Sequence, residues 1–177
     1  MFKHIVVAAF IASVPYSLLA AEPAADFVEH ISALTNARSG SPQKLKKGDA
    51  ATTKATFKPP VEIVIEAKTD STNLRISYAA DQVIFNWEGM RGQLRVDGGP
   101  ANGHHKSGAG VIPPNKYVTV RWVVTPKKQS IYVDQQLRFE HSGDYSRIDN
   151  PVSIFGGAGS EITIKSIKVK QLPPGTE

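Results

Sequence analysis

The sequence predicts an all-β protein in which many short antiparallel strands build a sandwich or a barrel. Beyond Ala50, apolar and polar residues alternate with a period of two, which is typical of strands with one buried face. Turn-forming residues such as Ala80-Asp81 and Gly156-Gly157 end these segments. No helical period of useful length competes after residue 60. Strands in this number favour two sheets whose inner faces pack together.

The first residues have the pattern of an export signal. Lys3 precedes the apolar stretch Ile5 to Ala12, and small residues follow at the expected cut after Ala20. The apolar stretch is too short to cross a bilayer, which needs about 20 apolar residues. We therefore expect residues 1–20 to be a signal peptide, no membrane span after its removal, and a periplasmic or extracellular destination.

Residues 21–44 should form an N-terminal arm or linker. Its apolar residues recur at the helical spacings of four and three, after a possible N-cap at Asp26: Phe27, Ile31 and Leu34. A short helix is thus allowed here, and an ordered arm or a frayed leader is the alternative.

One sandwich domain is expected over residues 45–172, with a short tail at 173–177. A cut after Ala20 leaves 157 of the 177 residues, which suits a single core. The chain has no cysteine, which excludes disulfides and thiolate catalysis. Burial must therefore hold the fold, and the sequence leaves the oligomeric state open.

The net charge of +5 is concentrated in one region. Residues 38–58 carry six basic side chains and one acidic side chain, while the rest of the body is nearly neutral. A cluster of this kind is more often a solvated segment than a patch for an anionic polymer. We expect no nucleic-acid partner.

The expected strands follow one another after Pro59-Pro60. Each is an alternating segment bounded by turn chemistry: 61–67, 74–78, 83–87, 93–97, 117–125, 130–134, 137–141, 152–155 and 162–170. In the segment 117–125, alternate residues should enter the core: Val118, Val120, Trp122 and Val124. In the last segment the apolar phase slips near Lys165-Ser166, which predicts a bulge.

Several segments together resemble a known family. The strand with Trp122, the Lys127-Lys128 turn, the strand Ile131 to Asp134 and the closing strand Ile162 to Leu172 look like the concanavalin A-like lectin and glucanase superfamily, with its laminin-G-like domains. The resemblance covers about residues 45–172 and implies a two-sheet antiparallel jelly roll. The superfamily includes sugar-binding modules, glycoside hydrolases, polysaccharide lyases and interaction domains, so the fold does not specify a function.

Two positions depart from the family pattern. The family usually continues the second strand as Asp-Gly, whereas this chain has Asp134-Gln135; Gln is a poor occupant of positive φ, which predicts a different turn. Glu62 and Glu66 are similar to the glutamate pair of retaining glucanases, but Val64 replaces the aspartate between them. We therefore assign no catalytic residue.

The candidate ligand-binding residues lie on one expected polar face. If the strand 83–87 turns Trp87 and its apolar partners inward, its polar residues would share the outer face with arginines of other strands. The members of this face are Arg75, Asn86, Glu88, Arg95 and Arg121. Such a face could grip hydroxyls, carboxylates or sulfates of a glycan. The alternative is a solvated sheet exterior with weak ion pairs.

The loop 97–110 is the longest irregular segment of the body. Its glycines make it adaptable, and His104 and His105 could contact a ligand. Neighbouring imidazoles on an extended chain point apart, so we expect no metal site and no cofactor.

These observations favour an exported, non-catalytic carbohydrate-binding or adhesive module whose partner is a polysaccharide or an acidic glycan. One alternative is a polysaccharide-active enzyme, a hydrolase or a lyase, in which Glu88 or the pair His104-His105 supplies acid and base. Another is a structural or assembly domain that uses the N-terminal arm.

Overall fold

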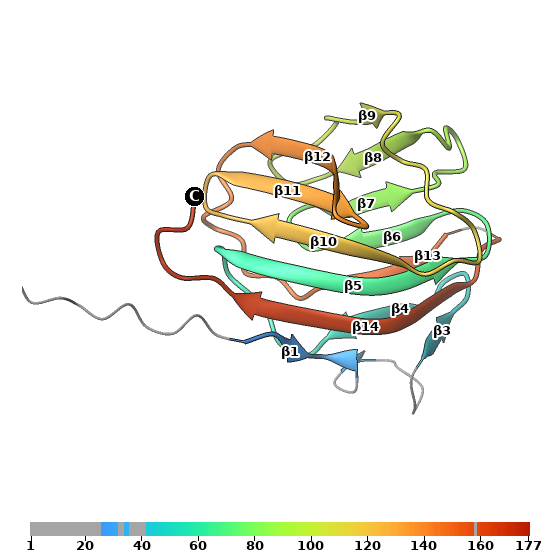
Figure 1. Cartoon of the computed structure of the whole chain (residues 1–177), viewed down its shortest axis with the longest axis horizontal. Coiled ribbons are helices and arrows are strands. Elements are labelled where there is room, and N and C mark those ends of the chain that lie inside the picture. The colour runs from blue at the N-terminus through green and yellow to red at the C-terminus, as the bar shows by residue number, and fades with distance from the viewer. Residues whose placement is uncertain (1–25, 32–33, 36–41, 158) are drawn as a thin grey trace, which may run out of the picture.

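The computed structural model describes residues 26–31, 34–35, 42–157 and 159–177. These residues form two antiparallel sheets packed face to face, and they contain no α-helix (Figure 1). The all-β sandwich expected from the alternation is thus confirmed. No helix of the described part is long and apolar enough to span a membrane. The predicted signal peptide lies outside the described residues.

The first sheet, here called the β5 sheet, has the strand order β1-β14-β5-β10-β11-β12, with β3 also paired to β14. Its strands are β1 (Val28–Glu29), β3 (Gln43–Leu45), β5 (Val61–Thr69), β10 (Val118–Val124), β11 (Lys128–Val133), β12 (Gln136–Ser142) and β14 (Ile162–Gln171). Its long central strands are the segments in which period-two alternation is clearest in the sequence.

The second sheet, here called the β7 sheet, has the order β2-β4-β13-β6-β7-β8-β9. Its strands are β2 (Leu34–Thr35), β4 (Ala50–Thr53), β6 (Leu74–Ser77), β7 (Gln82–Phe85), β8 (Gln93–Asp97), β9 (Lys106–Ser107) and β13 (Ser153–Gly156). Strands distant in sequence are neighbours in this sheet. For example, β13 pairs with β4 on one side and with β6 on the other.

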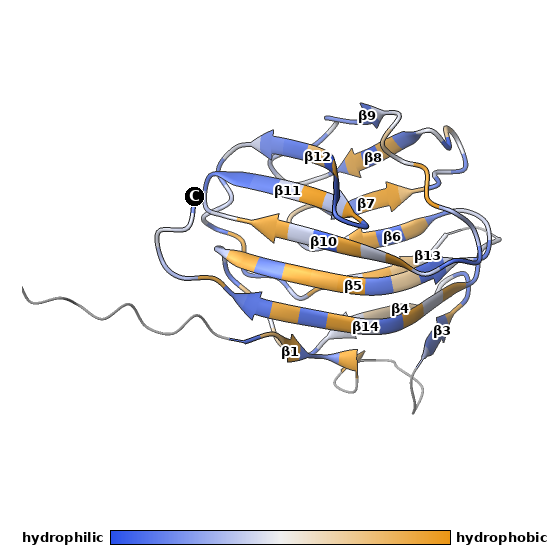
Figure 2. Cartoon of the chain, viewed as in Figure 1, coloured by the Kyte–Doolittle hydropathy of each residue, from blue (hydrophilic) through white to orange (hydrophobic). Residues whose placement is uncertain are grey.

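The core lies between the two sheets and follows from the alternation of the strands. Figure 2 shows apolar and polar residues alternating along β5 and β14. The residues predicted for the inner face of β10 are all buried, as expected: Val118, Val120, Trp122 and Val124. The indole Nε1–H of Trp122 donates to Gln129 Oε1 at 2.9 Å, which satisfies the one polar atom of this side chain.

The bulge predicted near Lys165-Ser166 is confirmed. The register between β14 and β5 shifts between Ile164 and Ser166, which lets apolar residues on both sides of the shift reach the core. Just beyond it, the Ile167 N–H donates to the Glu29 carboxylate at 3.0 Å. The arm therefore supports the irregular part of β14.

The N-terminal segment is an arm and not a helix wherever the structure describes it. β1 pairs with β14 of the β5 sheet, and β2 pairs with β4 of the β7 sheet. Of the alternatives left open by the sequence, the helix is wrong for these residues, which pair as an ordered arm. Backbone pairing at two sheet edges prevails over a weak local helical period.

The β11–β12 hairpin differs from its prediction. Asp134 and Gln135 form a two-residue loop in which both have positive φ, 47° and 69°, as in a type I′ turn. The expectation of a different turn is therefore wrong. The Thr119 N–H donates to the Asp134 carboxylate at 2.9 Å, and the Asp134 N–H donates to the Thr119 carbonyl at 2.9 Å. These two bonds hold the tight turn even though Gln135, unlike glycine, has a Cβ that disfavours positive φ.

We expect Gln135→Gly to stabilise the protein by about 1 kcal/mol, because glycine adopts positive φ without the steric cost of a Cβ. Urea unfolding followed by circular dichroism measures the change. Gln136→Gly, one residue later in β12, is the matched control and should destabilise. An unchanged or lower stability of Gln135→Gly would contradict the strain assigned to this position.

Candidate functional site

The outer face of the β7 sheet carries a row of residues, here called the arginine row. Cross-strand pairing places Phe155, Arg75, Ile84 and Arg95 side by side on β13, β6, β7 and β8. Adjacent strands lie about 4.8 Å apart, so the two guanidinium groups flank one isoleucine. Val83 and Phe85 face the core, so Ile84 between them faces outward. Ile84 is nevertheless buried.

A second set of outward residues on the same sheet is polar. Gln82 and Asp97 are cross-strand partners on β7 and β8. Ser153 pairs with Ser77 of β6 and with Thr52 of β4, and the Thr52 and Ser153 hydroxyls are 2.8 Å apart. The face therefore combines guanidinium, amide, carboxylate, hydroxyl and aromatic groups.

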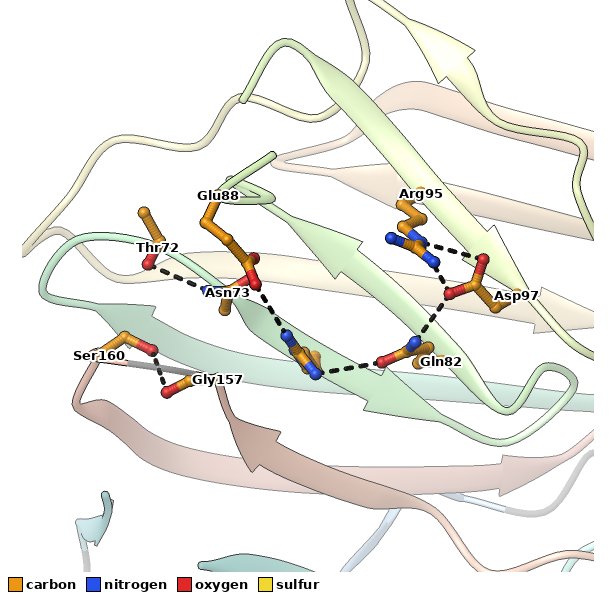
Figure 3. Close-up of polar contacts among 9 residues, drawn as sticks. Thr72, Asn73, Gln82, Glu88, Arg95, Asp97, Gly157 and Ser160 are labelled. Atoms are coloured by element: carbon orange, nitrogen blue, oxygen red, sulfur yellow. Dashed lines mark hydrogen bonds and ion pairs between the residues drawn. The ribbon is translucent and has the colours of Figure 1, made fainter. Parts of the chain in front are cut away.

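A continuous hydrogen-bonded network joins several of these groups (Figure 3). Arg95 Nε donates to both oxygens of Asp97, at 3.0 and 2.8 Å, and Gln82 Nε2 donates to Asp97 Oδ2 at 2.7 Å. Burial alone would raise the pKa of Asp97, but the hydrogen bonds from Arg95 and Gln82 outweigh it and lower that pKa below its ordinary value. Asp97 is thus held as a carboxylate.

Arg75 occupies the middle of the network with much looser contacts. Its Nη1 donates to Gln82 Oε1 and its Nη2 to Glu88 Oε1, both at 3.4 Å. Its Nε is buried and has no partner among the described residues. The Arg75 side chain keeps 22% of its surface exposed, and that of Glu88 keeps 45%.

Trp87 belongs to this face and not to the core. The Arg95 guanidinium lies 4.5 Å from the centroid of the indole ring, a cation–π contact. A Cβ on Gly89 would come within 2.8 Å of the same ring, so glycine is required for this packing. The prediction that Trp87 shares the inner face with Val83 and Phe85 is wrong, because β7 ends at Phe85.

Asn86 does not lie on the outer face, and its predicted placement there is wrong. It is fully buried and has a φ of 49°, which reverses the alternation. Its Oδ1 accepts from the Ile112 N–H at 3.0 Å, and its Nδ2 donates to the Ile112 carbonyl at 2.8 Å and to the Ser71 carbonyl at 3.3 Å. Asn86 therefore replaces backbone pairing inside the molecule.

Arg121 also lies elsewhere, so its predicted grouping with Arg75 and Arg95 is wrong. It belongs to β10 in the β5 sheet. Its Nε donates to the Glu62 carboxylate, and its guanidinium lies 4.9 Å from the centroid of the Tyr132 ring. Glu66, on the same face, pairs with Lys165 at 2.7 Å, so both glutamates of β5 are held by cations.

The two histidines of the loop 97–110 have separate environments. His105 Nδ1 accepts from the Val96 N–H at 3.1 Å, whereas the His104 ring lies 4.6 Å from that of His141. Burial, followed by the nearby His104, lowers the pKa of His141. No group of three or more metal-ligating side chains occurs in the described part of the chain. Neither histidine has a hydrogen bond to the network of Arg75, Asp97 and Arg95 among the described contacts.

Phe155 and Gln82 are the important members of this face that the sequence analysis missed. Both were available from alternation: Ile154 faces the core, so Phe155 must face outward, and the same holds for Gln82 beside Val83. The alternation is hard to read at these positions because both strands have only four residues, which is too short for a clear period of two.

No protein-family model matches the chain, and no curated protein matches its sequence. Solved structures match it clearly in fold. The exoplasmic/lumenal domain of VIP36, in a form bound to calcium and Man3GlcNAc, superposes with a TM-score of 0.59 at 10% identity, over 90% of this chain and 88% of that one.

Two carbohydrate-active enzymes are similar in the same way. The β-glucanase of Bacillus licheniformis has a TM-score of 0.55 at 13% identity, over 77% of this chain and 82% of that one. The transglycosylase Crh5, in its apo form, has a TM-score of 0.55 at 15% identity, with 86% of each chain covered. At these identities the likeness concerns the fold alone, which is the concanavalin A-like jelly roll.

Proposed function

We propose that the chain is an exported, non-catalytic carbohydrate-binding module and that the outer face of the β7 sheet is its binding surface. The observation that carries the proposal is the arginine row, in which Phe155, Arg75, Ile84 and Arg95 lie side by side on four strands. It offers an aromatic surface next to fixed polar groups, which is the combination that a sugar ring and its hydroxyls require.

The tight part of the network supports binding because it is already ordered. Asp97, Gln82 and Arg95 hold one another at 2.7 to 3.0 Å, so little side-chain entropy remains to be lost when a ligand arrives. Both lectin and glucanase structures share the fold, and this supports carbohydrate as the class of ligand.

The electrostatics of the same face support the non-catalytic form of the proposal. Glycoside hydrolysis needs two carboxyl groups, one of which has a raised pKa and acts as general acid. The carboxylates of this network are Asp97 and Glu88, and the lowered pKa of Asp97 is the opposite of what a general acid needs. Arg75 and Gln82 separate the two groups (Figure 3).

The proposal predicts that Phe155→Ala weakens binding to soluble polysaccharides about tenfold, the loss expected for one aromatic contact. Affinity electrophoresis against neutral and acidic polymers measures the effect. Tyr132→Ala removes an aromatic ring from the outer face of the other sheet and is the matched control. Equal affinities of the two variants, or no binding of any polymer by the unaltered protein, would contradict the proposed surface.

A further inference from the structure

We propose that the ligand of this surface is an acidic glycan and that Arg75 is the residue that binds its carboxylate or sulfate group. This inference rests on the proposed function and names the ligand class. The two arginines of the arginine row differ in how closely their charges are paired: Arg95 holds a carboxylate at 2.8 Å, whereas the nearest carboxylate to Arg75 lies at 3.4 Å.

Arg95 has its partners inside the network. Its Nε donates to both oxygens of Asp97, and its guanidinium packs on the Trp87 ring. An incoming anion would compete with the Asp97 carboxylate at 2.8 Å and would experience the negative charge of that group. Arg95 therefore positions Asp97 and Trp87 and is a poor anchor for an acidic ligand.

Arg75 is held by its partners much more loosely than Arg95. A guanidinium carries five N–H donors. Within the described part of the chain, the hydrogen bonds of Arg75 are two contacts at 3.4 Å, at the long limit for a hydrogen bond. Among the arginine ion pairs of the described residues, its pair with Glu88 is the longest, since Arg95 and Arg121 hold their carboxylates at 2.8 and 2.5 Å. Its charge is therefore the most loosely paired of the three.

The geometry of a guanidinium decides which ligand group would pair best with this loosely held charge. Its planar fork matches two oxygens of a carboxylate or sulfate and forms short, charge-assisted bonds with them. Glu88 is 45% exposed and contacts Arg75 through one oxygen only. A ligand carboxylate that takes two donors can therefore replace it at small cost.

The neighbours of Arg75 favour such a contact. Phe155 and Ile84 lie on either side of it along the row, and apolar neighbours strengthen an ion pair by excluding water. On the same strand, Ser77 lies two residues away and pairs across to Ser153, so hydroxyl groups lie close to the guanidinium. An acidic sugar could place its ring on Phe155, its carboxylate on Arg75 and its hydroxyls toward these serines.

The test compares polymers that differ only in charge. Polygalacturonate and its fully methyl-esterified form share one backbone, and dextran sulfate and dextran extend the comparison to sulfate. We expect the unaltered protein to bind the acidic member of at least one pair at least tenfold more tightly. Arg75→Gln should remove most of that preference, and Arg75→Lys, which keeps the charge but loses the fork, should remove part of it.

Arg121→Gln is the matched control, because it makes the same substitution on the outer face of the β5 sheet. It should leave the preference within about twofold, because Arg121 lies on the other sheet, away from the proposed binding surface. A general attraction between a basic protein and an acidic polymer would instead be weakened equally by the loss of either arginine. Unchanged circular dichroism spectra would establish that each variant is folded.

The possible results separate the two proposals. Binding that is equal for acidic and neutral polymers, and that Phe155→Ala weakens, would overturn the acidic ligand while leaving the carbohydrate-binding surface in place. A preference that Arg121→Gln lowers as much as Arg75→Gln would also overturn the role of Arg75. Absence of binding to all four polymers would overturn both proposals.

Discussion

Asn86→Ala is expected to lower the free energy of unfolding by about 3 to 8 kcal/mol, although the substitution removes only a small polar side chain. Asn86 satisfies both the N–H and the carbonyl of Ile112 in the interior. Each buried backbone group left without a partner costs about 1 to 3 kcal/mol. Alanine at a φ of 49° adds about 1 to 2 kcal/mol.

Two further variants separate these contributions. Asn86→Gly removes the hydrogen bonds but tolerates positive φ, so it should be more stable than Asn86→Ala by about 1 kcal/mol. Asn86→Asp keeps an acceptor for the Ile112 N–H but turns a carboxylate toward the Ile112 carbonyl, and it should also destabilise. Urea unfolding midpoints measure all three. A loss below about 1 kcal/mol in Asn86→Ala would show that Asn86 is not the structural residue described above.

Trp122→Ala should be of comparable severity and should cost about 3 to 5 kcal/mol, the range for deletion of a large aromatic side chain from a core. Trp122 is 1% exposed and packs edge-on against Tyr78, with 6.1 Å between ring centroids. The cavity would lie between the two sheets, where no solvent-exposed group can relax into it.

Trp122→Phe tests the polar part of the same site. It keeps most of the packing but removes the N–H that donates to Gln129 Oε1, and Gln129 is fully buried. We expect a loss of about 1 to 3 kcal/mol from the acceptor left unsatisfied. Thermal unfolding of both variants beside the unaltered protein provides the measurement. Equal stabilities of Trp122→Phe and Trp122→Ala would contradict a packing role for the indole.

The parts of the fold that the sequence predicted well are those governed by local alternation. The segment 93–97 is a strand with those bounds, and the inward residues of β10 and the phase slip in β14 are confirmed. In each case the signal is the period-two exposure of one strand, which a single sequence contains. The tight turn at Asp134-Gln135 was missed because two hydrogen bonds between Asp134 and Thr119, a residue on another strand, hold it.

The candidate site was predictable only in part, because a binding face depends on which strands are neighbours. Arg75 and Arg95 share a face because β7 lies between β6 and β8, but Arg121 has the same alternation and belongs to the other sheet. Alternation gives the side of a strand and not its sheet. Asn86 was misplaced for a different reason, since its positive φ interrupts the alternation directly after Phe85.

The edges of the two sheets also determine where another chain could attach. In the described residues, the terminal strands β1, β2 and β9 are each two residues long, whereas β12 has seven residues and pairs only with β11. Short edge strands resist the addition of a foreign strand. β1 and β3 together cover the outer side of β14. Intermolecular strand addition, whether in ordered assembly or in aggregation, would therefore occur at β12, beside the exposed Leu137.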